Sequence, residues 1–219
     1  MDNVHKLAIF DIDKTIISKD SMFLFLWYGM KKKPLTWFHA IAVVCKTVLY
    51  TLKLMKVEDV KASFFYAIRH MEEEDLERFY ETVLKKHIFI EAMEELKTKK
   101  AEGYHILLVS ASPYAYMRFF KKIPYVDEVI GTNLAIEDGR YTNRVEGVNC
   151  KGEEKVVRIH NYLKSRSLLI DYDQSCAYSD SLSDMPLFKL VKNRYLINRS
   201  YPGMEELRWN RAITSITDI

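Results

Sequence analysis

KLAIFDIDKTII, residues 6–17, is the segment from which the rest of this chain can be interpreted. It opens with a short apolar run, residues 7–10, that ends abruptly at two carboxylates, Asp11 and Asp13, followed by Thr15. An apolar run of this length between polar residues predicts a buried strand of a parallel sheet that helices cover on both faces. The two aspartates then lie at the carboxyl end of the strand, where open α/β sheets bind ligands.

The spacing of the two aspartates allows them to act on one ligand. Residues i and i+2 of an extended chain point to the same side, so Asp11 and Asp13 converge if the backbone stays extended. Two like charges this close repel, and a bound cation or a raised pKa on one carboxyl relieves the repulsion. Taken alone, the pair favours an acidic turn after a strand, which is common, so the later segments decide between the two interpretations.

Three later segments supply further polar side chains. Ser110 ends the apolar run HILLVS, Lys155 lies in CKGEEKVVRI, and Asp180 and Asp184 lie in AYSDSLSDMPLF. Together with the DxDxT pattern after a hydrophobic strand, these segments resemble the four motifs of the haloacid dehalogenase (HAD) superfamily, in the family's order. The resemblance is closest to subfamily IB, the phosphoserine-phosphatase-like hydrolases, whose members carry similar VSAS and YSDSxxD strings.

Length and composition bound the class of protein. A chain of 219 residues with 48% hydrophobic and 29% charged residues is typical of a globular protein with one large core and a smaller second unit. Its net charge is +3 and no dense basic stripe accompanies it, so we expect no nucleic-acid partner.

The cysteines and the first residues bear on the cellular compartment. Cys45, Cys150 and Cys176 are widely spaced and lack a His neighbour at ligand spacing, which argues against a disulfide framework or a zinc site. The apolar run near the N-terminus is too short for a secretory signal. We therefore expect a cytoplasmic protein in a reducing compartment.

Helical patterns fill the chain after the first predicted strand. Asp20 and Ser21 can cap a helix that begins at Met22. Apolar residues at helical spacing over residues 58–71 and 74–87 predict two further helices.

The resemblance implies a division of the chain into two parts. Residues 19–88 would form an α-helical C1 cap inserted after the first strand, and residues 1–18 and 89–219 would form the catalytic core. A mobile cap would exclude water from the reacting group and bring specificity residues to it.

Residues 35–55 form a second apolar stretch that three interpretations fit. Its length of about 20 residues is what a membrane span needs, but Lys46 and Lys53 would be costly near the middle of one. A helix in contact with a membrane surface stays open, because the basic residues 31–33 adjoin aromatics such as Trp37. We favour a helix of the cap.

The remaining chain predicts alternating strands and helices, which indicate a Rossmann-like α/β core of three layers with a parallel five-stranded sheet. Ser112 and Pro113 are expected to begin a helix, which would place Ser110 at an anion-attracting N-terminus. The other predicted elements are helix 91–101, strands 104–109, 128–132, 175–178 and 195–198, hairpin 134–145 around Asp138-Gly139, a helix from Lys151 or Lys155 to about residue 163, and a surface helix and tail after residue 200.

The resemblance also implies roles for the two aspartates. Asp11 would attack a phosphoryl group and form an aspartyl-phosphate, which splits one difficult step into two. Asp13 would protonate the leaving group and then deprotonate the attacking water.

A metal and a set of phosphate contacts are implied as well. Mg²⁺ prefers hard oxygens with few carboxylates, and the implied ligands are Asp11, the main-chain carbonyl of Asp13, and Asp180, with Asp184 supporting them. Thr15, Ser110 and a lysine would hold the phosphoryl oxygens. Lys155 is favoured over Lys151, because the buried helix positions lie four, seven and eight residues beyond it and because the string in the resembling family often reads CxxxxK, which Cys150 and Lys155 match.

Specificity is suggested at one position. Asp20 stands where phosphoserine phosphatases carry an acidic residue that meets the ammonium group of the substrate. Those enzymes typically follow the motif serine with two glycines, whereas this chain has Ala111 and Ser112, so phosphoserine itself is not implied. Arg69 could meet a substrate carboxylate, although a surface arginine is the favoured interpretation.

The sequence thus predicts a Mg²⁺-dependent phosphomonoesterase that acts on a small organic phosphate. One alternative is a phosphatase for a lipid or amino-alcohol headgroup phosphate at a membrane surface. Another is a non-enzymatic phospho-accepting receiver module, against which Asp13 and the helical insertion argue. A dehalogenase needs neither Asp13 nor a magnesium site, and a phosphomutase can be separated only by its products. The physiological substrate and the oligomeric state stay open.

Overall fold

The computed structural model describes residues 4–32, 43, 45–46, 49, 51–54 and 62–212. The competing interpretations of residues 35–55 therefore fall mostly outside the described residues. Within the described residues, no helix has both the length and the apolar character that crossing a bilayer requires.

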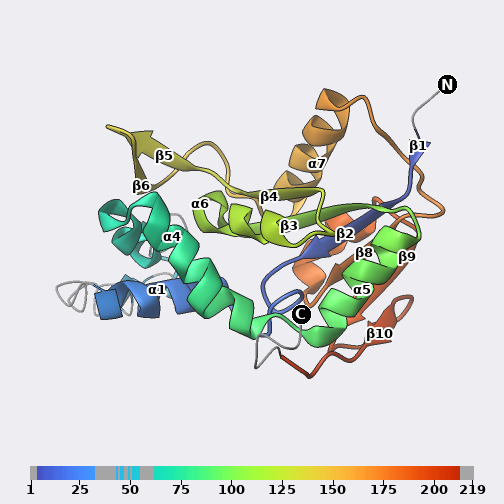
Figure 1. Ribbon diagram of the computed structural model, residues 1–219, viewed down its shortest axis with the longest axis horizontal. Coiled ribbons are helices and arrows are strands. Elements are labelled where there is room, and N and C mark those ends of the chain that lie inside the picture. Colours follow the sequence, from blue (N-terminus) through green and yellow to red (C-terminus); the bar gives the residue numbers. More distant parts are fainter. Residues whose placement is uncertain are drawn as a thin grey trace.

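A parallel sheet forms the centre of the molecule (Figure 1), with the strand order β10-β9-β8-β2-β3-β4. Its strands are β2 (Leu7–Asp11), β3 (His105–Pro113), β4 (Glu128–Thr132), β8 (Cys176–Ser179), β9 (Asn193–Ile197) and β10 (Glu205–Leu207). The predicted Rossmann-like α/β fold is confirmed, but the sheet has six strands instead of five. The additional strand, β10, lies where a surface helix was expected, because its backbone pairs with β9.

Helices cover both faces of the sheet and create three layers. Leu7 and Ile9 of β2 lie in an apolar cluster with the buried side chains of α7 (Glu153–Ser165). Phe10 points to the other face and joins a cluster with α5 (Ile90–Ala101). Each fully buried apolar side chain contributes roughly 1.5–3 kcal/mol. This two-sided burial explains why the first four residues of β2 are all apolar.

Short elements complete the core. They are β1 (Val4–His5), which pairs with β7 (Leu169–Ile170), α6 (Tyr114–Met117), a 3-10 helix (Arg118–Lys122), a second one (Leu182–Asp184), and α8 (Met185–Phe188). The expected helix start at Ser112 and Pro113 is wrong, because β3 continues to Pro113 and pairs there with Thr132. Ser110 consequently lies inside a strand.

The predicted hairpin is present as β5 (Leu134–Glu137) and β6 (Arg140–Val145). Its two turn residues, Asp138 and Gly139, have φ values of 50° and 76°. Positive φ at both central positions is what the favoured two-residue hairpin turn requires, and an Asp-Gly pair supplies it at little strain.

The elements of residues 19–88, which we call the helical segment, lie at one end of the sheet (Figure 1). They are α1 (Ser21–Lys32), a 3-10 helix (Tyr66–His70), α4 (Glu73–Phe79), a π-helical turn (Tyr80–Leu84) and a 3-10 turn (Lys85–His87). The helix expected over 74–87 is thus interrupted, and the wider turn keeps Tyr80 and Leu84 buried. The helix expected over 58–71 falls partly outside the described residues.

Aromatic packing joins the helical segment to the core. The ring of Phe25 lies 5.2 Å from that of Phe79 and stacks at 4.9 Å on Tyr116 of α6. Gly29, one turn further along α1, passes so close to Ala67 that an added Cβ would overlap the Ala67 methyl group. The apolar cluster therefore runs without a break from α1 into the sheet.

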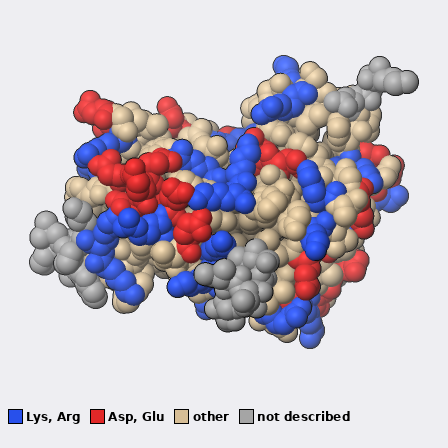
Figure 2. Space-filling model, in the orientation of Figure 1, with Lys and Arg blue, Asp and Glu red and all other residues tan. Residues whose placement is uncertain are grey.

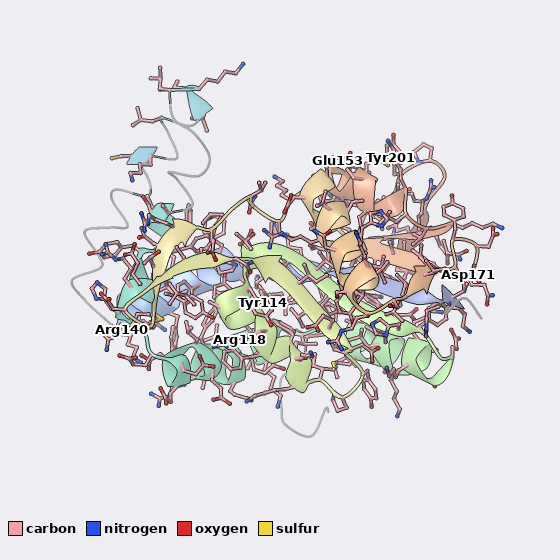
Figure 3. The ribbon with its side chains drawn as sticks, turned by 90° about the horizontal axis from the view of Figure 1, so that it is seen from above. Tyr114, Arg118, Arg140, Glu153, Asp171 and Tyr201 are labelled. Atoms are coloured by element: carbon pink, nitrogen blue, oxygen red, sulfur yellow. The ribbon has the colours of Figure 1, made fainter. Side chains whose placement is uncertain are left out.

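Ion pairs join α4, its N-cap residue and the π-helical turn after it to β6 and to the 3-10 helix Arg118–Lys122. Figure 2 shows acidic side chains gathered over α4 with basic ones beside them, and Figure 3 shows where Arg118 and Arg140 lie. The pairs are Glu72–Arg140, Glu73–Arg118, Glu77–Lys122 and Glu81–Lys122. Exposed pairs are worth at most about 1 kcal/mol each, so they orient α4 more than they stabilise it.

Candidate active site

A cavity of about 430 Å³ opens at the carboxyl ends of β2, β3 and β8. It is lined by Asp11, Asp13, Lys14, Asp20, Met22, Phe65, Ala111, Ser112, Asn149, Lys151, Lys155, Asp180, Ser181, Ser183 and Asp184. Five aspartates and three lysines are among these residues, so the cavity is rich in charge with an excess of carboxylates. Such an edge of a parallel sheet is the usual place for a ligand.

Lys155 links two of the aspartates in the wall of the cavity. Its Nζ donates hydrogen bonds to Oδ1 of Asp11 at 2.6 Å and to Oδ2 of Asp184 at 2.8 Å. The lysine is 2% exposed and belongs to the first turn of α7. Gly152 allows this turn to begin, because its φ of 59° belongs to the region that glycine adopts most easily.

Burial and the contact between Asp11 and Lys155 act in opposite directions on the pKa of each residue. Burial raises the pKa of Asp11, the charges of Asp184 and Asp13 act in the same direction, and the charge of Lys155 opposes them. Burial would lower the pKa of Lys155, but the carboxylates of Asp11 and Asp184 outweigh it and raise the pKa instead. The lysine therefore stays charged among carboxylates that burial destabilises as anions.

Three hydrogen bonds fix the carboxylate of Asp13. The backbone N–H of Ser21 donates to Oδ1 at 2.6 Å, and the hydroxyls of Ser110 and Ser112 donate to Oδ2 at 2.9 Å each. The backbone N–H of Ser112 also donates to Oγ of Ser110. Ser110 is fully buried, so its hydroxyl lies behind Asp13 and away from the cavity wall that Ala111 and Ser112 form.

Thr15 and Asp180 are joined across the sheet. The hydroxyl oxygen of Thr15, which is fully buried, accepts a hydrogen bond from the backbone N–H of Asp180 at 3.0 Å. Asp180 itself lines the cavity, and burial raises the pKa of its carboxyl. Thr15 thus sets the position of the loop that carries Asp180.

Asp20 and Lys151 lie at the rim. Asp20 caps α1, because its Oδ1 accepts from the backbone N–H of Met22 at 3.0 Å, and burial followed by the charge of Asp13 raises its pKa. Lys151 lines the cavity but is exposed, whereas Lys155 contacts Asp11. Arg69 lies outside the cavity, with its guanidinium group 6.0 Å from the ring of Tyr66.

Sequence reasoning missed two parts of this arrangement. Ser112 was expected only as a helix cap, although its spacing of two from Ser110 on a strand places both on the same side. The contact of Ser21 with Asp13 uses a backbone N–H, which no residue type encodes. Lys14 and Asn149 also line the cavity and carry no pattern that marks them.

The fold and the charged cavity agree with a family assignment. It belongs to the haloacid dehalogenase-like hydrolases, whose family profile matches residues 8–189. It is 26% identical over 199 residues to a histidinol-phosphatase of Neisseria meningitidis serogroup C, an alignment that covers 88% of this chain and 90% of that protein. The family is that of a hydrolase, so the alternative of a receiver module is not supported.

Solved structures agree on the fold. A protein of unknown function from Bordetella pertussis Tohama I superposes with a TM-score of 0.79 at 23% identity, covering 93% of this chain and 98% of that one. A phosphoserine phosphatase solved as a phospho-aspartyl intermediate analogue gives a TM-score of 0.63 at 19% identity, covering 88% of this chain and 86% of that one.

Proposed function

We propose that this protein is a Mg²⁺-dependent phosphomonoester hydrolase that acts on a small organic phosphate through an aspartyl-phosphate on Asp11. The observation that carries the proposal is the pairing of Asp11 with Lys155 at 2.6 Å, at the end of central strand β2 and on the wall of a charged cavity. Family membership and the phosphatase names of the relatives support it.

The reaction has two balanced steps. In the first, a carboxylate oxygen of Asp11 attacks phosphorus, the bond from phosphorus to the ester oxygen breaks, and that oxygen takes a proton from Asp13. In the second, Asp13 removes a proton from a water molecule that attacks phosphorus, and the bond from phosphorus to Asp11 breaks. Inorganic phosphate and the alcohol leave, and both aspartates return to their starting states.

The positive charge of Lys155 offsets charge on the phosphoryl oxygens during both steps. The hydroxyls of Ser110 and Thr15 are held by Asp13 and by the backbone of Asp180. We propose that their first contribution is to fix these two groups. Contact with a phosphoryl oxygen, as implied by the family, requires the hydroxyl of Ser110 to turn away from Asp13, whereas Thr15 accepts its hydrogen bond and keeps its own proton.

The residues present fit a magnesium ion. Among the described residues no three His, Cys, Asp or Glu side chains are grouped so as to hold a metal by themselves. Mg²⁺ needs no such group, since one or two carboxylates, a carbonyl, waters and a substrate phosphate suffice. Carboxylates outnumber lysines around the cavity, so a phosphate dianion is repelled unless a divalent cation accompanies it.

We propose that the carboxylates of Asp11 and Asp180 and the carbonyl of Asp13 hold the ion, with Asp184 supporting them. A bound ion would supply positive charge that offsets the negative charge of the phosphoryl group.

The helical segment is proposed to be the cap, with residues 1–18 and 89–219 as the core. Asp20, Met22 and Phe65 line the part of the cavity that the helical segment contributes. An acidic group beside two apolar side chains suits an amine-bearing alcohol portion, so Asp20 is the proposed specificity residue. The buried free thiols of Cys150 and Cys176 are compatible with the cytoplasmic location proposed for the protein.

Phosphate release tests the proposal. The substrates are p-nitrophenyl phosphate and a panel containing phosphoserine, histidinol phosphate, glycerol phosphate and sugar phosphates, each with Mg²⁺ or with EDTA. We expect Mg²⁺-dependent release by the wild type and at least about a 10³-fold loss in Asp11→Asn, because the nucleophile is removed. Release of phosphate that is unchanged in Asp11→Asn, or in EDTA, would refute the mechanism.

A further inference from the structure

The carboxylate of Asp13 is held by donors from two separate parts of the chain. Ser110 and Ser112 belong to β3 of the sheet, whereas Ser21 is the first residue of α1 in the helical segment. All three groups are buried, with Ser112 7% exposed and the other two fully inaccessible. The orientation of Asp13 is therefore decided by protein groups rather than by bulk water.

Two of the serines, Ser21 and Ser112, form a directed series of hydrogen bonds that ends at Asp13. The hydroxyl of Ser21 donates to Oγ of Ser112 at 2.9 Å, and the hydroxyl of Ser112 donates to Oδ2 of Asp13 at 2.9 Å. A hydroxyl has one proton, so the bond from Ser21 leaves the proton of Ser112 free to point at the carboxylate. Buried hydrogen bonds of this kind reinforce one another because the surroundings are weakly polar.

The position of Ser21 depends on how α1 packs against α6. Phe25, one turn further along α1, stacks on Tyr116 of α6, and both rings are fully buried. A shift of α1 away from α6 would break the Phe25–Tyr116 contact and withdraw both donors of Ser21, its N–H and its hydroxyl. The carboxylate of Asp13 would then lose its donor on Oδ1, and Ser112 would lose the partner that orients it.

We propose that Ser112 is a positioning residue for Asp13, and that Ser21 couples the orientation of the Asp13 carboxyl group to the packing of α1 against α6. This inference rests on the proposed function, in which Asp13 gives its proton to the leaving oxygen. The geometry keeps Oδ1 of Asp13 on the backbone N–H of Ser21 and Oδ2 on the hydroxyls of Ser110 and Ser112, which fixes the direction in which the carboxyl group faces the cavity.

Leaving-group dependence separates this role from a structural one. Phenyl phosphate and p-nitrophenyl phosphate have similar shapes, but phenolate is the poorer leaving group and needs the proton of Asp13 more. The value of kcat/KM reports the free energy of the first chemical step relative to free enzyme and substrate. A misplaced Asp13 lowers it mainly for phenyl phosphate, whereas general damage to the site lowers it for both.

The experiment measures kcat/KM for both esters in Ser112→Ala. We expect a loss of about tenfold for phenyl phosphate and less than about threefold for p-nitrophenyl phosphate. Ser112→Thr, which keeps the hydroxyl, should recover most of the loss. The matched control is Ser165→Ala, which removes an exposed hydrogen-bonded serine hydroxyl far along α7 and should change neither value.

A second variant keeps the test decisive if Ser112→Ala does not fold. Ser21→Ala should lower kcat/KM for phenyl phosphate by about threefold and that for p-nitrophenyl phosphate by less. In the double variant Ser21→Ala/Ser112→Ala the two losses should not multiply, because both residues act through the same series of hydrogen bonds to Asp13. Equal losses for the two esters, or no loss, in the folded variants would overturn the positioning role. Asp13→Asn provides the reference: if it too affects both esters equally, the acid assigned in the proposed function fails and this inference with it.

Discussion

Nζ of Lys155 and Oδ1 of Asp11 lie 2.6 Å apart in a buried contact that joins the first turn of α7 to the end of β2. The same Nζ also holds Asp184. One ammonium group therefore compensates two carboxylates that have little access to water, and the arrangement is costly to break because removal of the cation leaves buried charge without a partner.

Lys155→Met should destabilise the metal-free protein strongly. We expect the free energy of unfolding to fall by about 3–5 kcal/mol, the usual effect of breaking a buried ion pair, together with loss of phosphatase activity. Urea denaturation at pH 7.5 in EDTA measures it. Lys151→Met is the control, because Lys151 is exposed and should change stability by no more than about 0.5 kcal/mol. A larger effect in Lys151→Met than in Lys155→Met would contradict the assignment.

Magnesium should stabilise the folded protein independently of catalysis. A ligand at tenfold excess over its Kd adds about 1.4 kcal/mol, which raises the melting temperature of a chain of this size by about 3–6 °C. We expect this rise in the wild type and little rise in Asp180→Asn, measured by thermal denaturation at constant ionic strength. Asp173→Asn, on the surface, is the control and should behave like the wild type. Equal shifts in all three proteins would exclude Asp180 as a ligand.

Gly29→Ala should loosen the helical segment. The added methyl group would overlap the Cβ of Ala67, and overpacking of this kind costs about 1–3 kcal/mol, more than the gain in helix propensity of about 1 kcal/mol. Chemical denaturation should show a net loss of stability. Ala67→Gly removes the methyl group with which the new side chain would overlap. The double variant should therefore lose less unfolding free energy than the sum of the losses in the two single variants. Strict additivity would show that the overlap is relieved elsewhere.

His105 should make the protein sensitive to mild acid. Its ring is half-buried, with Nε2 2.9 Å from the hydroxyl of Tyr162 and Nδ1 3.8 Å from Asp127. Burial lowers its pKa, the charges of Lys100 and His5 act in the same direction, and Asp127 opposes them. The balance favours the neutral ring in the folded state.

The sign of the pH effect follows from that shift. Because the folded pKa of His105 lies below the unfolded value of about 6.5, the unfolded chain binds more protons near that pH. Stability is then fully present above about pH 6.5 and falls as the pH drops through the folded pKa. His87, whose pKa is also lowered by burial, contributes in the same direction. Urea denaturation at pH 7.5, 6.5 and 5.5 gives the free energy of unfolding at each pH. This free energy should fall less steeply with decreasing pH in His105→Gln than in the wild type, and an equally steep fall would refute the role of His105.

Much of the fold was predictable from residue patterns. The apolar run of β2 predicts burial on both faces, and its Asp11 therefore lies at the ligand-binding edge of the sheet. The spacing of Ile159 and Leu163 predicts the buried side of α7, and together with the CxxxxK string of the family it favours Lys155 over Lys151. The Asp138-Gly139 pair predicts its hairpin because few residues accept positive φ twice in succession.

Other features could not be predicted, for physical reasons. Strand β10 contains two glutamates and one leucine, so its pairing with β9 depends on backbone hydrogen bonds rather than on an apolar pattern. The support of Asp13 by Ser21 is likewise a backbone contact between segments that pack only in the folded chain. The roles of these residues in catalysis remain predictions for experiment.

The central claim is that Asp11 carries the phosphoryl group during turnover, and trapping that group tests it most directly. Enzyme mixed with p-nitrophenyl phosphate and Mg²⁺ is quenched in acid within the first turnovers, and the peptides are examined by mass spectrometry. The account predicts one phosphoryl group on the peptide containing Asp11, labile to hydroxylamine and absent in Asp11→Asn. A phosphoryl group on another residue, or hydrolysis that continues in Asp11→Asn, would contradict it.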